Sequence, residues 1–392
     1  MSCKRLLLLN TNLAVGGAER QLLHVARYLD RSRWEVSVLV LEKQGLFCKD
    51  LPDDVKLHAL SEHLPESAPG KLSWSLRQAG AVREFLRANN FDAVLTFLWL
   101  PSLLCALALR GLKRRPKFVW SVQSDLEADF ASRWLGGLRS LLVKRYIPPQ
   151  VAHYIAISEG VAGKITKVLR IPLPGITIIP NAIDLTVIDK LKEEKPADLK
   201  NKAPGRLRLI SVGRLAPQKA HHDLLAGFAE ACKSSAQDLE LVILGEGPER
   251  NRLESLIAEL GIEGRVFLPG VAANPYAWMY ESDAFVLASA WEPFGIVITE
   301  ALAAGLPVIT TATDGGKDIV GSSGAGIMVP VGDKSALSRA ILSLVSAPEK
   351  RAALGRKARE RAKDFDAAAI VPLYDTVLKQ VTTERINDEQ RG

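Results

Sequence analysis

Cysteine is scarce and scattered in this sequence. The chain has four cysteines among 392 residues, at Cys3, Cys48, Cys105 and Cys232, with no CxxC pair and no cluster of cysteine with histidine. Disulfide frameworks and structural zinc sites both require such spacings, so the pattern argues against each of them. The cysteine usage therefore favours a reducing compartment.

Long apolar runs are missing as well. The longest uncharged run, residues 93–109, is shorter than the roughly 20 residues that cross a bilayer, and Pro101 interrupts it. The first apolar stretch, "RLLLLN", has only four leucines, fewer than the roughly seven apolar residues of a signal-peptide core. We expect a buried strand at "RLLLLN", a strand running into a helix over 93–109, and a cytoplasmic protein.

Acidic residues are outnumbered by basic ones, which gives a formal net charge of +7 and a pI of about 9.2. Residues 110–117, "RGLKRRPK", contain five basic side chains and no acid. Such an excess attracts phosphorylated substrates, acidic lipids or nucleic acid. No nucleic-acid-binding motif accompanies it, so we expect no nucleic-acid partner. The apolar and basic stretch 134–149 fits either a core helix or a helix on the inner face of the cell membrane, as a peripheral attachment.

Short apolar runs alternate with helical patterns from end to end, and this alternation predicts parallel βα units. The rhythm breaks at residues 190–206, which are charged and contain two prolines, and then restarts with "LRLISVG". We predict two doubly wound α/β domains with a ligand cleft, residues 1–200 and 201–365. The helical stretch 366–392 is expected to pack back on the first domain.

Glycines and cations follow the predicted strands, at the edge where open parallel sheets bind ligands. Gly16 and Gly17 precede the first helix, where backbone amides can approach an anion or form a plain tight turn. In "SVGRLAPQK", Gly213 ends a strand, and Arg214 and Lys219 form a cation pair suited to a diphosphate.

Two further turns follow strands of the second half. "LGEGPER" carries Gly245 and Glu246 but lacks the third glycine of a dinucleotide fingerprint, and no GxxxxGK[ST] occurs anywhere. Val271, in "FLPGVA", lies in a turn that suits a base pocket as well as an ordinary loop.

The stretch "EPFGIVITEALAAG" places Glu292 on a turn and Glu300 in the helix that should follow. Paired carboxylates serve in glycoside hydrolysis, in metal sites or in gripping hydroxyl groups. A hydrolase needs its two carboxyls across one bond, about 5–10 Å apart, which this spacing does not require. The separation favours two parts of one extended ligand, a sugar and a ribose. The amides of Phe294, Gly295 and Ile296 would begin the helix and could hold a phosphate.

These motifs together resemble the nucleotide-sugar domain of the family-4 (group 1) retaining glycosyltransferases, and "GGAER" and "IPNAID" fit the same family. The resemblance implies the GT-B fold, two Rossmann-like domains facing a cleft. It implies that Arg214 and Lys219 neutralise the donor diphosphate, and that Glu292 and Glu300 bind the transferred sugar and the ribose. It also implies that the amides at Phe294, Gly295 and Ile296 hold sugar and phosphate. The donor-binding set is Gly16, Gly17, Gly213, Gly245, Glu246, Val271, Phe294, Gly295, Ile296 and Glu300.

One position departs from the family pattern. Many relatives carry a histidine where "VWSVQSD" has Gln123, and a glutamine cannot act as a base. We therefore leave the base unassigned and keep Gln123, with Asn181 of "IPNAID", as contacts to sugar or acceptor. Asp364 and Asp366 form an Asp-x-Asp pair, but far in sequence from the phosphate loops, so we expect neither a metal ion nor a cofactor.

The resulting hypothesis is a retaining glycosyltransferase. It would move a hexosyl unit from a nucleoside-diphosphate sugar to a hydroxyl of a glycan or lipid-linked acceptor, in polysaccharide, lipopolysaccharide or glycolipid assembly. Two alternatives stay open on the residues: a sugar-nucleotide epimerase of the same fold, and a non-catalytic nucleotide-sugar-binding module.

Overall fold

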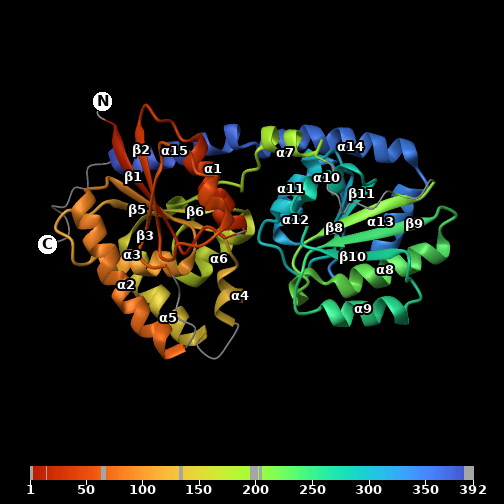
Figure 1. The fold of residues 1–392 in the computed structure, drawn as a ribbon, viewed down its shortest axis with the longest axis horizontal. Coiled ribbons are helices and arrows are strands. Elements are labelled where there is room, and N and C mark those ends of the chain that lie inside the picture. Colours follow the sequence, from red (N-terminus) through yellow and green to blue (C-terminus); the bar gives the residue numbers. More distant parts are fainter. Residues whose placement is uncertain are drawn as a thin grey trace. The chain divides into compact units, whose positions relative to one another are not determined.

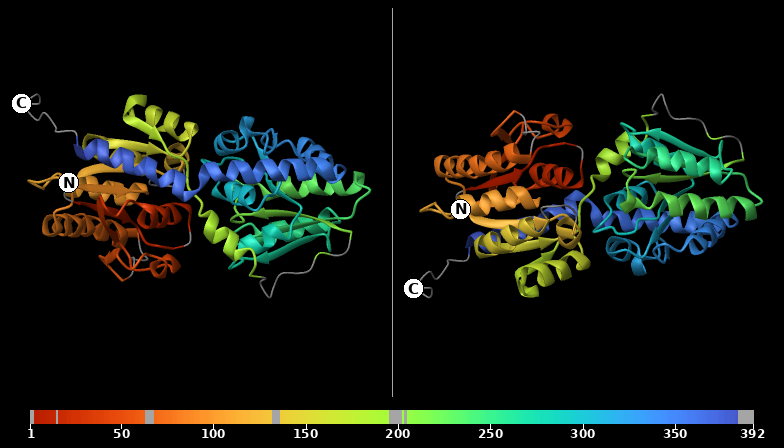
Figure 2. Two further views of the ribbon diagram at one scale, coloured as in Figure 1. Left: turned by 90° about the horizontal axis from the view of Figure 1, so that it is seen from above. Right: turned by 90° about the horizontal axis from the view of Figure 1, so that it is seen from below.

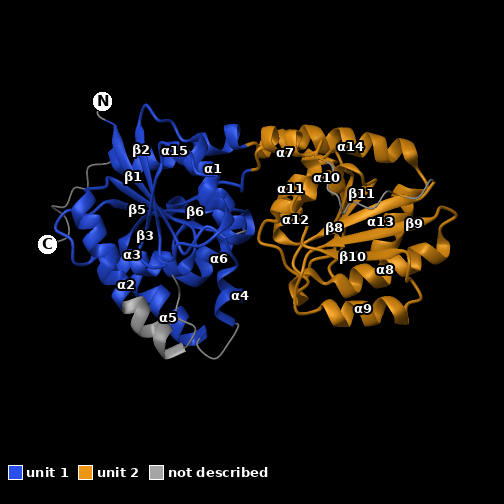
Figure 3. Ribbon diagram, in the orientation of Figure 1, with its two compact units in different colours: residues 1–182, 367–392 blue, residues 183–366 orange. Residues whose placement is uncertain are grey.

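The computed structural model describes residues 3–14, 16–62, 68–131, 136–194, 202 and 205–383. The chain forms two compact units, residues 1–182 with 367–392, and residues 183–366 (Figure 3). The sequence pattern places the boundary near residue 200, whereas the units divide after Ala182. The reason is α7 (Leu185–Leu191), which packs on helices of the second unit although it precedes the charged stretch. Most of the predicted linker, 195–201 and 203–204, lies outside the described residues.

The first unit is built on a seven-stranded parallel sheet with the order β3-β2-β1-β4-β5-β6-β7. Helices cover both faces of this sheet (Figure 1). Its strands are β1 (Lys4–Asn10), β2 (Trp34–Val40), β3 (Lys56–Ala59), β4 (Ala93–Thr96), β5 (Lys117–Val122), β6 (Val151–Ala156) and β7 (Ile176–Ile178). Its helices are α1 (Gly17–Tyr28), α2 (Ala68–Asn89), α3 (Trp99–Leu109), α4 (Leu126–Ala131), α5 (Gly136–Tyr146), α6 (Glu159–Leu169) and α15 (Ala367–Thr383), with 3₁₀ turns at Leu46–Lys49, Pro148–Gln150 and Leu173–Gly175.

The second unit has a six-stranded parallel sheet with the order β10-β9-β8-β11-β12-β13. Helices again lie on both sides of it (Figure 2). Its strands are β8 (Leu207–Val212), β9 (Leu239–Leu244), β10 (Val266–Gly270), β11 (Ala284–Leu287), β12 (Val308–Thr311) and β13 (Gly326–Val329). Its helices are α7, α8 (His221–Ser234), α9 (Arg250–Glu259), α10 (Pro275–Tyr280), α11 (Ile296–Ala303), α12 (Asp314–Ile319), α13 (Lys334–Val345) and α14 (Pro348–Ala362), with 3₁₀ turns at Pro217–Lys219, Gly321–Ser323 and Lys363–Phe365.

In both sheets the first strand in the chain lies in the centre, and the strand order reverses there. This is the doubly wound order 3-2-1-4-5-6 of Rossmann-like domains. The predicted α/β class is therefore confirmed. The predicted strand "RLLLLN" is β1, whose Leu6, Leu7, Leu8 and Leu9 are completely buried because both faces of the sheet are covered. The run 93–109 forms β4 and α3, and no helix of the described residues is long and apolar enough to cross a membrane.

The C-terminal helix α15 belongs to the first unit. It packs on α1 and contributes Ile370, Val371, Tyr374, Val377, Leu378 and Val381 to the core that surrounds β1. Trp34 of β2 donates its indole N–H to Asp375 at 2.7 Å, and Lys4 donates to the Thr382 hydroxyl at 2.8 Å. A stretch more than 180 residues away in sequence therefore completes the hydrophobic core of the first unit.

A matched pair of leucines on α15 tests this role. We expect Leu378→Ala, at a fully buried position, to lower the free energy of unfolding by about 2–5 kcal/mol, because a cavity opens in the core. Leu373→Ala removes the same atoms from a side chain that is 43% exposed and should cost less than about 1 kcal/mol. Urea unfolding followed by far-UV circular dichroism measures both. Equal losses for the two variants would contradict the packing role of α15.

Candidate active site

The residues singled out in the second half gather at the carboxyl edge of the second sheet. β8 and β11 are neighbours at its centre, the point where the strand order reverses. Arg214 and Lys219 follow β8, and Glu292 follows β11. Ligands of doubly wound sheets bind beyond this reversal point, because the loops that leave the two central strands turn to opposite faces and leave a crevice.

A buried ion pair joins the two loops. Lys219 Nζ lies 2.5 Å from Glu292 Oε2, and the two side chains are only 14% and 9% exposed. The Ser289 hydroxyl donates to the same carboxylate oxygen at 3.3 Å, and the Ala290 amide donates to the Gln218 carbonyl at 2.8 Å. These bonds hold the Glu292 carboxylate and the Lys219 ammonium in one place, so the site combines an anion-binding and a hydroxyl-binding group.

Glycines bring the loops after β8, β9 and β10 into backbone contact. Gly245 has φ +141°, and a Cβ added there would lie 2.0 Å from the Gly213 carbonyl oxygen. The Gly245 amide donates to the Gly270 carbonyl at 2.8 Å, and the Leu215 amide donates to the Glu246 carbonyl at 3.0 Å. At Gly213 a Cβ would lie 3.1 Å from Lys219 Cε, so this glycine leaves room for the lysine stem.

Glu246 and Val271 lie one and two strands away from Arg214 along this edge. The Glu246 carboxylate accepts from Arg250 Nε at 2.8 Å, and this guanidinium holds the pKa of Glu246 below its usual range. The Val271 side chain is 73% exposed, an arrangement available to a flat apolar ligand.

The loop after β11 turns into α11 at Gly295, whose φ of +91° only glycine adopts readily. Phe294 is buried against the Phe365 ring, with centroids 5.9 Å apart, and this packing anchors the loop. Ile296 is the first residue of α11, and the first amides of a helix lack intrahelical acceptors. Glu300 lies one turn further along, 4% exposed, and accepts the Tyr276 hydroxyl at 3.0 Å.

Neither the Asp-x-Asp pair nor any other group offers a metal site in the part of the chain that the structure describes. No group of three or more His, Cys, Asp and Glu side chains suitable for a metal ion occurs there. Asp364 pairs with Arg361 at 2.8 Å, and Asp366 accepts the Leu185 amide at 3.5 Å. Asp366 therefore links the end of α14 to the start of α7, whereas the Asp364 pair is local to the end of α14.

His221, which follows Lys219 by two residues, is completely buried at the start of α8. Burial, helped by the nearby Lys219 charge, lowers the pKa of His221 to about 4. The imidazole is therefore neutral at physiological pH and forms part of the buried start of α8.

The remaining sequence-selected residues lie in the first unit. Gly16 is the N-cap of α1, six residues after the end of β1, and a Cβ there would lie 2.3 Å from the Glu19 carboxylate. Gln123 follows β5, and its Nε2 donates to the Ser121 hydroxyl at 2.8 Å, while Oε1 is buried without a partner among the described residues. Asn181 follows β7 and is 4% exposed, and its Oδ1 is likewise buried and unpartnered within the described chain.

Sequence patterns miss several groups that hold these side chains. Ser289 contacts Glu292, Tyr276 contacts Glu300, and Tyr374 lies 3.3 Å from the Ser121 hydroxyl beside Gln123. Ser289 is only three residues from Glu292, but no spacing rule singles it out, whereas Tyr276 and Tyr374 come from elements that only folding brings close. The Gln21 side chain, which donates to Ala182 O at 2.8 Å and accepts from Ala182 N at 2.7 Å, is a further example.

Two protein-family models match the chain. The model described as Glycosyltransferase Family 4 matches residues 15–187, and the model described as Glycosyl transferases group 1 matches residues 192–361. The chain belongs to the group 1, family 4 glycosyltransferases. The recognition made from the sequence motifs is confirmed, and the enzyme is a glycosyltransferase.

Known proteins are similar to this glycosyltransferase over nearly its whole length. The Campylobacter jejuni N-acetylgalactosamine-N,N'-diacetylbacillosaminyl-diphospho-undecaprenol 4-alpha-N-acetylgalactosaminyltransferase is 27% identical over 361 residues, covering 92% of this chain and 95% of that protein. Anabaena HepE, solved with UDP and glucose, superposes with a TM-score of 0.76 at 20% identity, covering 95% and 99% of the two chains. WaaG, a glycosyltransferase involved in lipopolysaccharide biosynthesis, gives 0.71 at 18% identity, covering 97% and 100%. These structures confirm the GT-B fold.

The glycine contact between the loops after β8 and β9 can be tested directly. We expect Gly245→Ala to lower the free energy of unfolding by about 1–3 kcal/mol, because the new methyl group collides with the Gly213 carbonyl at a positive φ. The displacement should also move Arg214 and reduce transfer activity. Thermal unfolding and activity assays measure the two effects.

Gly80→Ala, in α2, is the matched control. Its added Cβ meets no atom within 4 Å, so stability should stay equal or rise by up to about 1 kcal/mol. A Gly245→Ala enzyme with unchanged stability and activity would show that the close approach of the two loops is not required.

Proposed function

We propose that this glycosyltransferase moves a hexosyl unit from a nucleoside-diphosphate sugar to a hydroxyl of a glycan or lipid-linked acceptor, with retention of anomeric configuration. The observation that carries the proposal is the buried Lys219–Glu292 pair at the reversal point of the second sheet. It combines a cation for phosphate with a carboxylate for sugar hydroxyls, which a nucleotide sugar requires together.

The donor diphosphate would bind between Arg214, Lys219 and the first amides of α11. An arriving phosphate would compete with Glu292 for the Lys219 ammonium, and the freed carboxylate would then accept hydrogen bonds from hydroxyls of the transferred sugar. Glu300, a buried carboxylate that accepts the Tyr276 hydroxyl, suits the vicinal hydroxyls of a ribose. This division gives the two glutamates different parts of one ligand.

Other selected residues complete the donor and acceptor sides of the proposal. Gly213, Gly245, Glu246 and Val271 would border the nucleoside along the same sheet edge. The family resemblance assigns the backbone amides of Gly16 and Gly17 to the diphosphate as well. Gln123 and Asn181 offer buried carbonyl oxygens that accept hydrogen bonds, which suits sugar hydroxyls.

Retention follows from same-face attack. The bond between the anomeric carbon and the phosphate oxygen breaks while the acceptor oxygen bonds to the same face of that carbon. The departing phosphate oxygen takes the acceptor proton, so no enzyme base is needed. Gln123, which cannot accept a proton at neutral pH, is compatible with this scheme. The cations at Arg214 and Lys219 would stabilise the negative charge that develops on the leaving nucleotide.

A lipid-linked acceptor at a membrane is supported by the relatives and by one surface helix. The Campylobacter jejuni relative is named for a diphospho-undecaprenol acceptor, and WaaG for lipopolysaccharide biosynthesis. In α5 the side chains of Leu138 and Leu141 are 49% and 63% exposed, and Lys144 and Arg145 follow in its last turn. The helix contains no acidic residue, so this α5 face suits the inner surface of an anionic membrane.

The structure brings the two basic segments of the sequence together at α5. The guanidinium groups of Arg110 and Arg145 lie 5.2 and 5.7 Å from the centroid of the Tyr146 ring. Arg110 therefore adds its positive charge to the end of the α5 face, which strengthens attraction to acidic lipids. Trp134 and Leu135 of the sequence-selected stretch lie outside the described residues.

Replacement of Glu292 tests the transfer function. We expect Glu292→Gln to lower kcat by about 100-fold or more, because the hydroxyl-binding charge is lost where the sugar reacts. Nucleoside-diphosphate binding should be kept or become tighter, since the phosphate ligands remain and Lys219 no longer pairs with a competing carboxylate. A panel of UDP-, GDP- and ADP-sugars in thermal-shift assays first selects the donor, and product formation is then followed by chromatography.

Glu259→Gln, an exposed glutamate of α9, removes the same charge elsewhere and should leave turnover unchanged. Wild-type turnover by Glu292→Gln would remove Glu292 from the mechanism. NMR of the product tests retention separately, because an inverted anomeric centre would exclude same-face attack.

Membrane attachment has its own test. We expect the enzyme to sediment with phosphatidylglycerol-containing vesicles at low salt and not with pure phosphatidylcholine. Lys144→Gln with Arg145→Gln should weaken sedimentation roughly thirtyfold, since each charge contributes about 1 kcal/mol. Arg33→Gln with Lys56→Gln changes the net charge equally away from α5 and is the control. Equal loss in both double variants, or binding that ignores lipid charge, would exclude the α5 face.

A further inference from the structure

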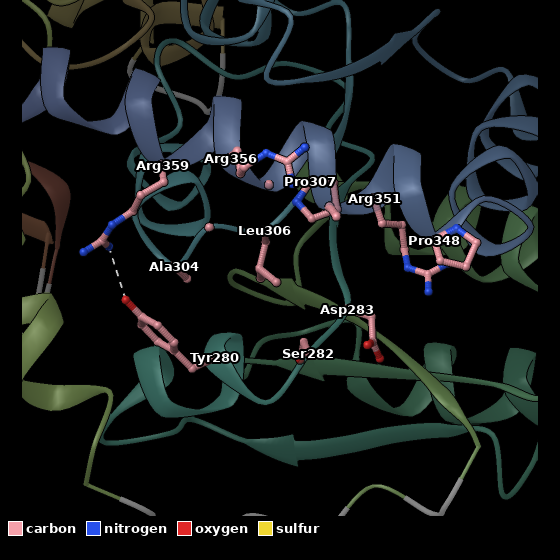
Figure 4. Close-up of a pocket in the computed structure, with 13 residues that line it drawn as sticks. Tyr280, Ser282, Asp283, Ala304, Leu306, Pro307, Pro348, Arg351, Arg356 and Arg359 are labelled. Carbon is pink, nitrogen blue, oxygen red and sulfur yellow. Dashed lines mark hydrogen bonds between the residues drawn. The ribbon is translucent and has the colours of Figure 1, made fainter.

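A cavity of about 600 Å³ lies in the second unit at the amino ends of β11 and β12. Glu292 and Lys219 follow the carboxyl ends of strands in the same sheet, so the cavity is at the opposite edge from the candidate active site. Its walls are α14, the turn after α11, and the residues between α10 and β11 (Figure 4). It is separate from every residue assigned to the donor.

Three arginines of α14 line this cavity: Arg351, Arg356 and Arg359. Arg356 and Arg359 are three residues apart and therefore lie at neighbouring positions on the helix surface. All three arginines line the cavity together with Tyr280, Leu306 and Asp283 (Figure 4). They belong to the basic stretch "RKARERAK" and its surroundings, which the proposed transfer function does not use.

The three arginines differ in how many hydrogen bonds their guanidinium groups already donate within the protein. Arg359 donates to both Asp189 oxygens, to the Tyr280 hydroxyl and to the Ala303 carbonyl, so its guanidinium is fully engaged. Toward the residues that the structure describes, Arg351 donates from Nη1 alone, to the Leu344 and Val345 carbonyls at 2.7 and 2.9 Å. Arg356 is exposed and makes no hydrogen bond or ion pair with any residue that the structure describes.

The charge balance of the lining favours an anion. Asp189 neutralises Arg359, and Asp283, the one acidic residue of the lining, accepts Lys202 Nζ and the Arg208 amide, each at 2.7 Å. Two guanidinium groups, of Arg351 and Arg356, are left without a carboxylate partner in the described chain. Planar guanidinium forks of this kind match the oxygens of phosphate groups.

The cavity walls are held by close backbone packing. A Cβ at Gly355 of α14 would lie 2.5 Å from the Gly305 carbonyl oxygen, so α14 approaches the turn after α11 as closely as backbones allow. Leu306 is 5% exposed and anchors that turn in the core. The cavity is therefore preformed, and its volume lies within the range of about 300–1,000 Å³ that small-molecule sites occupy.

We propose that this α14 cavity binds a small, soluble phosphate ester that also carries hydroxyl groups. Arg356 and the free nitrogens of Arg351 would hold the phosphate. The second carboxylate oxygen of Asp283 would accept a hydroxyl, and Leu306 and the Tyr280 ring would contact the carbon skeleton. The volume exceeds the needs of inorganic phosphate alone, which is why an ester rather than the bare ion is the expected ligand.

Titration with glycerol 3-phosphate, inorganic phosphate and glycerol tests the proposal in the full-length enzyme. We expect glycerol 3-phosphate to bind more tightly than inorganic phosphate, and glycerol alone not to bind. Arg356→Met should raise the Kd for glycerol 3-phosphate by about tenfold or more, because a charge-assisted phosphate contact is lost. Arg356→Lys, which keeps the charge and loses the fork, should fall between.

Lys357→Met is the matched control, since Lys357 is an exposed neighbour on α14 that does not line the cavity. Both variants lose one positive charge from one helical turn, and both keep Arg214 and Lys219. Phosphate binding at the donor site should therefore be the same in both variants, and a difference between their Kd values reports on the α14 cavity. Equal Kd values for Arg356→Met, Lys357→Met and the unmodified enzyme would overturn the proposal, as would the absence of any glycerol 3-phosphate binding.

Discussion

The buried ion pair between Lys219 and Glu292 is the interaction on which the candidate site depends. Each partner comes from a loop after one of the two central strands of the second sheet, so the pair exists only when β8 and β11 lie side by side. Two charges with this little exposure lose much hydration, and the attraction between them must offset that cost. A ligand that offers phosphate to the lysine and hydroxyls to the glutamate can replace the pair without leaving either charge buried alone.

Close backbone approach supplies the precision that this pair requires. Gly245, Gly270 and Gly295 adopt positive φ angles at successive turns of one sheet edge, and Gly213 leaves space for the lysine stem. Side chains at these points would push the loops apart and separate the cation from the carboxylate. The same device recurs at Gly305 and Gly355, where it sets the distance between α11 and α14. Helix α11 thus has a fixed position at both ends.

The sequence predicts the types and strand-end positions of the site residues well, because parallel sheets place functional loops at one edge. Arg214, Lys219 and Glu292 all follow strands, as their motifs indicate. Two supporting contacts are beyond sequence reasoning, Tyr276 to Glu300 and Tyr374 near Ser121 and Gln123, whereas Ser289 lies only three residues before Glu292. Tyr374 is separated from Ser121 by 253 residues, and no local pattern records such a contact. The boundary between the units also lies earlier in the chain than the sequence pattern predicts, because a charged stretch marks a loop and not necessarily the end of a packed core.

By itself, the sequence determined the α/β class, the two sheets and the family, since hydrophobic periodicity and motif spacing are local properties of the chain. Tertiary structure alone decided which charges pair and which stay available. Lys219 forms an ion pair with Glu292, and Arg359 forms one with Asp189, whereas Arg356 has no carboxylate partner among the described residues. The sequence alone does not distinguish these three basic residues. Tertiary structure also placed the guanidinium groups of Arg110 and Arg145 next to the ring of Tyr146. The physical reason is that electrostatic partners are set by distance in space, which the fold creates from residues far apart along the chain.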